Sequence, residues 1–234
     1  VISDDSDTDG DSLSVSGTVT QTSATDASGS SITINSPNSA SVGSAVTGYY
    51  GQLTLNSNGT YSYVANQSNA DALDSGESAT DVFTFTVSDG TTTTSSTITF
   101  TVNGANDAPT ASDNTVTTTE DNNHTFAASE FGFTDVDGDS LDHVTIATLP
   151  STGTLYLSGV AVSAGDQISA ANISNLVFTP AANGNGSPYD TFTFSVNDGT
   201  TDSASNYTMT VNVTAVNDAP TASDNTVTTT EDNN

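Results

Sequence analysis

Residues 82–87 read Val-Phe-Thr-Phe-Thr-Val. From Phe83 onward, an apolar side chain alternates with a threonine. Successive side chains of a β-strand point to opposite faces, and the alternation therefore predicts a strand with one face in a core. The phrase returns as Phe192, Phe194 and Val196, which begins 192 − 83 = 109 residues later. Both copies end in Asp-Gly, at 89–90 and 198–199. The recurrence predicts two related β domains.

A longer repeat indicates where these domains begin and end. The 18-residue string Asn-Asp-Ala-Pro-Thr-Ala-Ser-Asp-Asn-Thr-Val-Thr-Thr-Thr-Glu-Asp-Asn-Asn occupies 106–123 and 217–234, an offset of 217 − 106 = 111 residues. A β-sandwich of the immunoglobulin type needs about 100 residues, so this spacing is typical of one sandwich per period. We therefore expect an all-β chain with one module at 1–106, a second at 107–217, and the first strand of a following module at 218–234. We expect the first module to lack, within this segment, the strand that precedes the Asp-rich turn of the second module.

Shorter signals fill in the elements. Asn58-Gly59 lies between the strand-like segments 50–55 and 61–64 and predicts a β-hairpin. Further strands are expected at 153–157 and 176–179. The segment 169–174 reads Ser-Ala-Ala-Asn-Ile-Ser and is expected to form one helical turn.

Composition narrows the range of partners. The chain has 234 residues, 28 Asp and Glu, and no Lys or Arg, so its formal net charge is −28. Such self-repulsion opposes folding unless salt or bound cations relieve it. Without a cationic side chain to contact phosphate, we expect neither nucleic acid nor an anionic membrane surface as a partner. No apolar run approaches 18 residues, so direct membrane insertion is not expected, and the absence of Cys excludes disulfides.

The acidic residues are clustered in turns. Asp7, Asp9 and Asp11 surround Gly10, as Asp135, Asp137 and Asp139 surround Gly138. Carboxylates this close repel one another unless a cation bridges them. Oxygen ligands in a flexible turn suit Ca²⁺, whereas transition metals favour His or Cys. We therefore predict Ca²⁺ at both turns; the alternative is an ordinary solvated Asp-Gly turn without an ion.

Other acidic residues lie where modules should meet. Asn106-Asp107 and Asn217-Asp218 each come shortly before a proline that favours an extended connector. In a sandwich, the Asp-rich turn, the Asp-Gly pair and the connector could converge at one end. That arrangement would bring Glu120, Asp135, Asp137, Asp198 and Asn106-Asp107 within reach of a shared ion. The alternative is that the connectors are simply polar. The complete set of candidate metal ligands is Asp7, Asp9, Asp11, Asp89, Asn106, Asp107, Glu120, Asp135, Asp137, Asp139, Asp198, Asn217, Asp218 and Glu231.

The phrases Asp-x-Asp-Gly-Asp-x-Leu, Phe-Thr-Phe-x-Val-x-Asp-Gly and Val-Asn-Asp-Ala-Pro resemble cadherin-like repeats of large bacterial surface adhesins. Residues 113–220 are similar to the tandem repeats of RTX-type adhesins, and 51–63 with 72–90 resemble the related VCBS-type repeat. The resemblance implies tandem Ig-like (cadherin-like) Greek-key β-sandwiches joined end to end, with Ca²⁺ stiffening the junctions. Glu120, Asp135, Asp137 and Asp107 match the family's ligand motifs, as do Asp7, Asp9 and Asp89. The glycine-rich nonapeptides that name RTX proteins are absent.

The sequence thus favours a Ca²⁺-rigidified extender of a secreted bacterial adhesin, located at the cell surface or outside the cell, with neighbouring repeats as its partners. Two alternatives stay open. A self-assembling fibre or surface-layer subunit would use 218–234 as a donated strand, and a Ca²⁺-dependent carbohydrate-binding module would present Tyr49, Tyr50, Tyr61 and Tyr63 to glycans. The chain has no Cys, Lys or Arg to act as a nucleophile or to stabilise an anion, and we expect no enzyme activity.

Overall fold

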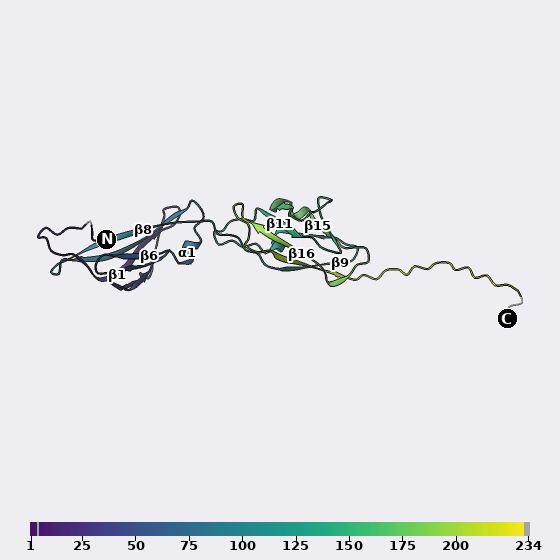
Figure 1. Cartoon of the computed structure of the whole chain (residues 1–234), viewed down its shortest axis with the longest axis horizontal. Helices are drawn as coiled ribbons and strands as arrows, with labels where there is room; N and C mark the ends of the chain where they lie inside the picture. The colour runs from purple at the N-terminus through teal and green to yellow at the C-terminus, as the bar shows by residue number, and fades with distance from the viewer. Residues whose placement is uncertain (4, 232–234) are drawn as a thin grey trace. The chain divides into compact units, whose positions relative to one another are not determined.

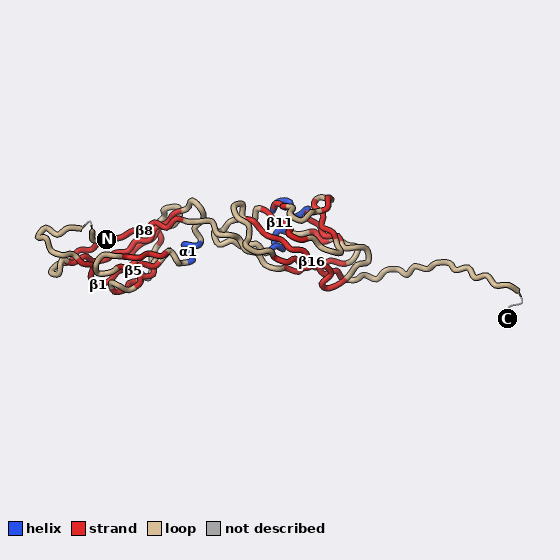
Figure 2. Tube along the Cα trace, in the orientation of Figure 1, coloured by secondary structure: helices blue, strands red, loops and turns tan. Residues whose placement is uncertain are grey.

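The computed structural model describes residues 1–3 and 5–231 of the chain. It is nearly all β, with 43% strand and 6% helix in the described part, and the fold is that of Ig-like β-sandwiches (Figure 2). The chain divides into two compact units (Figure 1). The first comprises Val1–Ala111, Phe133–Val144 and Ser195–Ser205, and the second comprises Ser112–Gly132, Thr145–Phe194 and the chain from Asn206 onward. In the described part, no helix is long and apolar enough to cross a membrane.

The strands before residue 104 form two sheets. One has the order β2-β1-β7-β8 with β3 also paired to β1, and the other has the order β4-β5-β6. A short helix, α1 (Ser68–Asp71), follows β6. The strand bounds are β1 (Ser14–Thr25), β2 (Ser31–Ile32), β3 (Ser39–Ser41), β4 (Ala45–Thr47), β5 (Gln52–Leu55), β6 (Tyr61–Val64), β7 (Ser78–Ser88) and β8 (Thr93–Asn103).

Alternation along β7 produces the core of this sandwich. Phe83, Phe85 and Val87 are at most 4% exposed, whereas the threonines between them face outward. They pack with Val15, Val19, Leu53 and Leu55 from the neighbouring strands. The predicted hairpin is confirmed, because β5 pairs with β6 and Gly59 turns with a φ of +79°.

The strands after residue 113 form two further sheets, with the orders β10-β15-β12-β13 and β14-β11-β16-β17-β9. β9 runs parallel to β17, while β16 is antiparallel to it. The helical turn expected at 169–174 is a 3-10 helix, η2 (Ala170–Asn175), and a second one is η1 (Ala128–Phe131). The strand bounds are β9 (Asn114–Thr119), β10 (His124–Thr125), β11 (His143–Thr148), β12 (Thr154–Leu157), β13 (Val160–Ala161), β14 (Gln167–Ser169), β15 (Leu176–Thr179), β16 (Gly186–Asn197) and β17 (Tyr207–Thr214).

Aromatic side chains fill this second core. Phe192 and Phe194 of β16 are fully buried, and they contact Phe126 and Phe131 edge-to-face with ring centroids 5.6 and 4.9 Å apart. The chain after β17 belongs to no strand as far as residue 230 (Figure 1). Residues 232–234, the end of the segment predicted as a following module's first strand, lie outside the described residues.

Candidate metal centre

The Asp-rich turn at 135–139 folds around its first carboxylate. Asp135 Oδ1 accepts the backbone N–H of Asp137 at 2.9 Å and that of Asp139 at 3.2 Å. Gly138 lies between them with a φ of +88°, a conformation that glycine adopts without a steric penalty. One carboxylate oxygen is therefore used by the turn itself, and the remaining oxygens are available to other partners.

The connector Asn106-Asp107 binds this turn as expected. The backbone N–H of Asp107 donates to Asp137 Oδ2 at 2.6 Å. Asn106 Nδ2 donates to Asp198 Oδ2 at 3.1 Å and to the carbonyl of Asp107 at 2.7 Å. The connector, the Asp-rich turn and the Asp-Gly turn after β16 thus converge, as the sequence predicted.

Asp198 is held as a carboxylate by its own turn. Its Oδ1 accepts the backbone N–H groups of Thr200 and Thr201, both at 2.6 Å, and only 9% of the residue is exposed. Burial acts to raise the pKa of Asp198, but these hydrogen bonds and the one from Asn106 outweigh it and lower the pKa below its usual value. Asp198 is therefore negatively charged at neutral pH.

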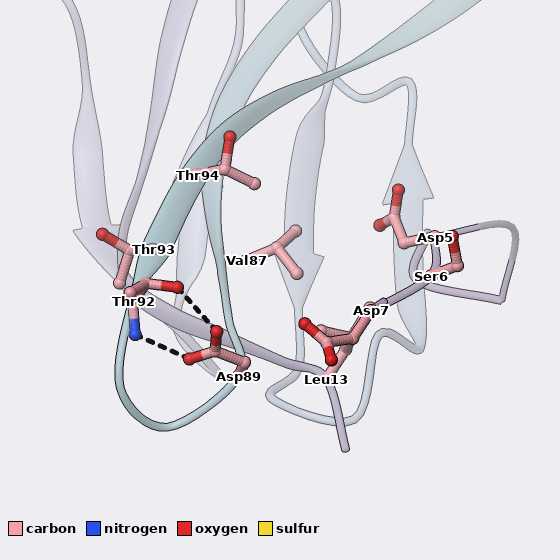
Figure 3. Close-up of a pocket in the computed structure, with 9 residues that line it drawn as sticks. All are labelled: Asp5, Ser6, Asp7, Leu13, Val87, Asp89, Thr92, Thr93 and Thr94. Atoms are coloured by element: carbon pink, nitrogen blue, oxygen red, sulfur yellow. Dashed lines mark hydrogen bonds between the residues drawn. The ribbon is translucent and has the colours of Figure 1, made fainter. Parts of the chain in front are cut away.

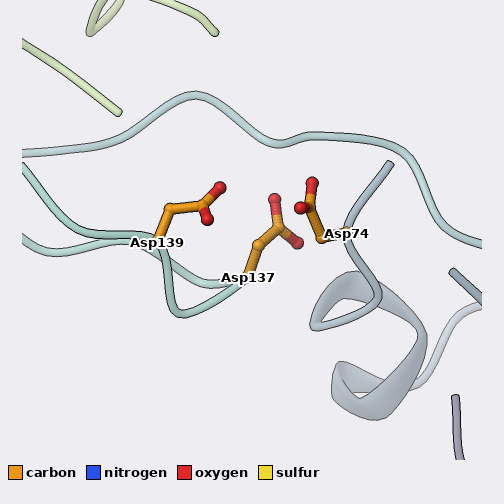
Figure 4. A group of neighbouring side chains, drawn as sticks. All are labelled: Asp74, Asp137 and Asp139. Atoms are coloured by element: carbon orange, nitrogen blue, oxygen red, sulfur yellow. The ribbon is translucent and has the colours of Figure 1, made fainter. Parts of the chain in front are cut away.

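Another acid, which the sequence reasoning missed, joins the centre. Asp74, from the loop after α1, belongs to the same compact unit as Asp137 and Asp139. The three side chains each place an oxygen within 4.8 Å of the other two (Figure 4). Burial raises the pKa of both Asp137 and Asp139, and the neighbouring negative charges raise both further. Burial and mutual repulsion thus both act against the charged form of these carboxylates.

Two oxygens at this centre have no partner. In the described part of the chain, Asp135 Oδ2 and Asp137 Oδ1 are buried atoms without a hydrogen bond. Buried carboxylate oxygens cost free energy unless they meet a donor or a cation. The chain has no Lys or Arg that could approach them. The donor set is all oxygen, which fits a hard divalent cation such as Ca²⁺.

The first Asp-rich turn repeats the local geometry of the second. Asp7 Oδ1 accepts the N–H groups of Asp9 and Asp11 at 2.9 and 3.2 Å. Asp89, the counterpart of Asp198, accepts the N–H groups of Thr91 and Thr92 and the Thr92 hydroxyl. These bonds, led by the hydroxyl, lower the pKa of Asp89 to about 2. A cavity of about 200 Å³ lies between the two turns, lined by Asp5, Asp7, Leu13 and Asp89 among others (Figure 3).

Glu120 lies elsewhere, and the prediction that it shares an ion with Asp135, Asp137 and Asp198 was wrong. β9 runs parallel to β17, so the end of β9, just before Glu120, lies beside Thr214 at the end of β17. β16 runs antiparallel to β17, so the end of β16, just before Asp198, lies near the start of β17. Glu120 is 3% exposed; its Oε2 accepts Asn185 Nδ2 at 3.2 Å and its Oε1 accepts the N–H of Val216. Strand direction, which the sequence did not show, separates the two places.

The last three candidates are exposed. Asn217 Nδ2 donates to the carbonyl of Asp218 at 3.0 Å, the bond that Asn106 makes to Asp107 in the first copy of the string. Asp218 and Glu231 are exposed to solvent. The string thus makes the same Asn–Asp hydrogen bond in both copies, although only the first copy binds an Asp-rich turn in the described structure.

The predicted tyrosine face is not formed as a set. Tyr50 is 3% exposed, and Tyr63 stacks on Phe100 with ring centroids 4.1 Å apart. The Tyr63 hydroxyl donates to Asp81 Oδ2 at 2.8 Å, and burial together with this bond raises the pKa of Tyr63. These two rings therefore belong to the core, which leaves no four-tyrosine platform for a sugar.

The sequence reasoning also missed two buried carboxylates that act within the fold. Asp81 is fully buried and accepts the N–H groups of Tyr49, Tyr50 and Gly51, together with Gln21 Nε2. Asp190 is 7% exposed and accepts the N–H groups of Ser151, Thr152 and Gly153 in the same way. Both lie two residues before the first Phe of a Phe-Thr-Phe phrase. An acid at the same position of two apolar strands is a pattern from which they could have been predicted.

Comparison with known proteins gives a family match over part of the chain. A model described as "Bacterial Ig domain" matches residues 106–214, which is the second sandwich with its connector. No curated protein sequence matches the chain. Among solved structures, a "glycoside hydrolase family 107" endo-fucoidan hydrolase is similar at 22% identity and a TM-score of 0.29, over 74% of this chain and 23% of the hydrolase. The chain therefore spans about a quarter of that enzyme's length.

Surface-layer protein SbsC is similar at comparable levels. Its domains 1–6 share 14% identity over 87% of this chain and 28% of theirs, with a TM-score of 0.28. Its domains 4 and 5 share 15% identity over 86% of this chain and 99% of theirs, with a TM-score of 0.26.

Proposed function

We propose that this chain, whose residues 106–214 form a bacterial Ig-like repeat, is a Ca²⁺-dependent extender segment of a bacterial cell-surface adhesin. The observation that carries the proposal is the pair of buried, unpartnered carboxylate oxygens, Asp135 Oδ2 and Asp137 Oδ1. They lie in a chain that has no cationic side chain other than histidine to neutralise them. An extender would present binding domains elsewhere in the protein for cell attachment or biofilm formation.

The residues present fit a calcium ion. Asp135, Asp137, Asp139 and Asp74 would supply carboxylate oxygens, and the Asn106-Asp107 connector already binds the same turn. Ca²⁺ accepts six to eight oxygen ligands in flexible geometry, so several carboxylates on separate loops suit it better than Mg²⁺. The bound ion would supply the positive charge that these carboxylates lack.

The free energy expected from Ca²⁺ binding is sufficient to hold loops in place. Extracellular Ca²⁺ modules have Kd values of about 10⁻⁴–10⁻³ M. At ten times Kd, one site adds about 1.4 kcal/mol to the free energy of unfolding. Against a total stability of about 5–15 kcal/mol for a domain, a few such sites would decide whether the segment stays rigid under load.

The test is a calcium titration of two charge-matched variants. Asp137→Asn removes a carboxylate from the centre, while Asp224→Asn removes an equal charge from an exposed site that is not among the candidate ligands. We expect Asp137→Asn to lose at least one Ca²⁺ equivalent in isothermal titration calorimetry and most of the rise in Tm that Ca²⁺ produces. Asp224→Asn should behave as the unchanged chain. Equal binding and equal Tm shifts for all three proteins would contradict the proposal.

A further inference from the structure

One buried nitrogen of the chain has no partner. Among the described residues, three buried side-chain atoms make no hydrogen bond, and two of them are the Asp135 and Asp137 oxygens of the candidate metal centre. The third is Nε2 of His143, the first residue of β11, whose side chain is only 15% exposed. A buried polar atom costs free energy unless it meets a partner, so this nitrogen requires an explanation of its own.

The other nitrogen of the ring is held by a carboxylate. His143 Nδ1 lies 2.8 Å from Asp142 Oδ2. An ionised carboxylate only accepts hydrogen bonds, so Nδ1 donates the proton and Nε2 of the neutral ring presents a lone pair. Metal-binding histidines share this arrangement, in which a carboxylate on one nitrogen orients the ring and the other nitrogen binds the ion.

A second carboxylate faces the free nitrogen. Asp202 Oδ1 lies 3.9 Å from His143 Nε2, which is too far for a hydrogen bond. Zn²⁺ binds imidazole nitrogen and carboxylate oxygen at about 2.0–2.2 Å, so two tetrahedral ligands lie about 3.4 Å apart. The Asp202 side chain is 61% exposed and is free to move by this small difference. Asn197 Nδ2 donates to the same Asp202 oxygen at 2.8 Å and keeps the carboxylate on this side of the turn.

The first sandwich has an equivalent place. Counting from the leucine that follows each Asp-rich turn, residues 142–143 correspond to 14–15, an offset of 142 − 14 = 128 residues. The strand pairing agrees with this alignment. Residue 14 pairs with Ser88, and the N–H of residue 142 donates to the carbonyl of Asn197. Ser88 and Asn197 are themselves counterparts, because 197 − 88 = 109 is the offset of the Phe-Thr-Phe phrases.

The residues Asp142, His143 and Asp202 are all replaced in the first sandwich. Their counterparts there are Ser14, Val15 and Thr93. Val15 is 2% exposed and belongs to the core, so an apolar side chain suits the position that His143 occupies. The second sandwich therefore has a histidine at a core position and an aspartate at each of the two neighbouring positions, and packing alone requires none of the three.

We propose that Asp142, His143 and Asp202 form a transition-metal site, in which Nε2 of His143 and a carboxylate oxygen of Asp202 bind Zn²⁺ or a similar divalent ion. Asp142 orients the ring, and two tetrahedral positions are left for water. Ca²⁺ takes oxygen ligands, whereas imidazole suits Zn²⁺ and Cu²⁺. The site therefore differs in its chemistry from the candidate metal centre, and the inference does not depend on the proposed Ca²⁺ binding.

Zinc titration of two histidine variants tests the site. The chain is kept in a large excess of Ca²⁺, which competes for the acidic turns, and Zn²⁺ is added in isothermal titration calorimetry at neutral pH. We expect one equivalent of Zn²⁺ to bind the unchanged chain. His143→Val should bind Zn²⁺ at least about tenfold more weakly. It should also fold, because valine occupies the equivalent place in the first sandwich.

His124→Val is the matched control. It removes the same ring from a histidine whose Nε2 already lies 3.2 Å from Glu130 Oε2. We expect its affinity for Zn²⁺ to stay within about twofold of the unchanged chain. Equal affinities of the unchanged chain and His143→Val, or equal losses in the two histidine variants, would overturn the proposal.

Asp202→Asn tests the carboxylate without a change in the core. An amide oxygen can still accept the bond from Asn197, but it lacks the negative charge that attracts the ion. We expect Zn²⁺ affinity to fall at least about fivefold, and Asp224→Asn to leave it unchanged. An Asp202→Asn variant that binds Zn²⁺ as tightly as the unchanged chain would remove Asp202 from the site.

Copper gives a direct view of the nitrogen ligand. In His124→Val, the electron paramagnetic resonance spectrum of one equivalent of Cu²⁺ should show hyperfine splitting from an imidazole nitrogen. The splitting should be absent when His143→Val is added. A Cu²⁺ spectrum without nitrogen splitting in His124→Val would contradict the site.

The two proposals fail separately. A chain that binds Zn²⁺ through His143 but binds no Ca²⁺ would retain this inference and lose the proposed function. A chain that is stabilised by Ca²⁺ but binds Zn²⁺ equally well with and without His143 would retain the proposed function and lose the transition-metal site.

Discussion

Asp81 and Asp190 show how a single carboxylate can hold a sandwich together. Each accepts three consecutive backbone N–H groups from the loop before a strand of the facing sheet. The last of these residues is a glycine, Gly51 or Gly153, and a Cβ there would lie 2.4 Å from the Tyr63 ring or 2.1 Å from the Phe178 ring. The acid and the glycine therefore fix the same loop from two sides. The motif ties β7 to β5 in one sandwich and β16 to β12 in the other.

We predict that Asp190→Asn lowers the free energy of unfolding by about 2–4 kcal/mol, because an amide cannot accept all the N–H groups that the carboxylate accepts. Burial alone would raise the pKa of Asp190, but the backbone hydrogen bonds outweigh it and lower the pKa below its ordinary value. A lowered folded-state pKa stabilises the protein above the unfolded-state pKa of about 3.9, and this stability is lost as the pH falls further. The difference in Tm between the unchanged chain and Asp190→Asn should therefore shrink below about pH 4. Asp224→Asn, an exposed acid, is the control, and a difference that does not depend on pH would refute the assignment.

Turns determine how the strands of each sheet are joined. The hairpin between β5 and β6 depends on Gly59, whose φ of +79° is unfavourable for other residues. Gly29 has a similar φ of +80° in an open turn. A Cβ on Gly59 would lie 2.5 Å from Ile2 Cγ1, whereas nothing lies within 4 Å of a Cβ on Gly29. The two glycines thus share a backbone conformation and differ in their surroundings.

We predict that Gly29→Ala lowers the free energy of unfolding by about 1 kcal/mol, the cost of a left-handed alanine. Gly59→Ala should cost about 1 kcal/mol more, because Ile2 must move from its place against the core. Urea unfolding of both variants measures the difference. Equal losses would show that the contact between the hairpin and the first residues of the chain contributes nothing to stability.

At the scale of the whole molecule, charge is the dominant property. A formal net charge of −28 without any Lys or Arg leaves the two histidines and the N-terminus to form ion pairs. His124 lies 3.2 Å from Glu130 and His143 lies 2.8 Å from Asp142. Most of the repulsion must therefore be relieved by ions from solution.

We predict that raising NaCl from 0.01 M to 1 M in EDTA increases Tm by several degrees, because the Debye length falls from about 30 Å to about 3 Å. Millimolar Ca²⁺ in low salt should raise Tm further than NaCl of equal ionic strength, since screening does not satisfy the buried oxygens of Asp135 and Asp137. Calorimetric scans under the three conditions decide between the two effects. A Ca²⁺ effect no larger than that of matched NaCl would reduce the role of calcium to screening.

Local patterns were sufficient to predict much of the fold. Alternating Phe and Thr predicted β7 and β16, Asn58-Gly59 predicted a hairpin, and the Asp-rich turns close on their first carboxylates as short loops do. Convergence of Asn106-Asp107 with Asp137 and Asp198 also followed from the expected sandwich.

The sequence by itself determined the strand pattern, the repeat and the excess of negative charge, because each of these depends on residues close together in the chain or on composition. Only the tertiary structure decided which acids meet. Parallel pairing of β9 with β17 separated Glu120 from the Asp-rich turn, and packing of the loop after α1 brought in Asp74. It also decided that Val116 is buried while the identical Val227 is exposed. Burial and ligand geometry depend on partners distant in sequence, so two identical strings can have different environments.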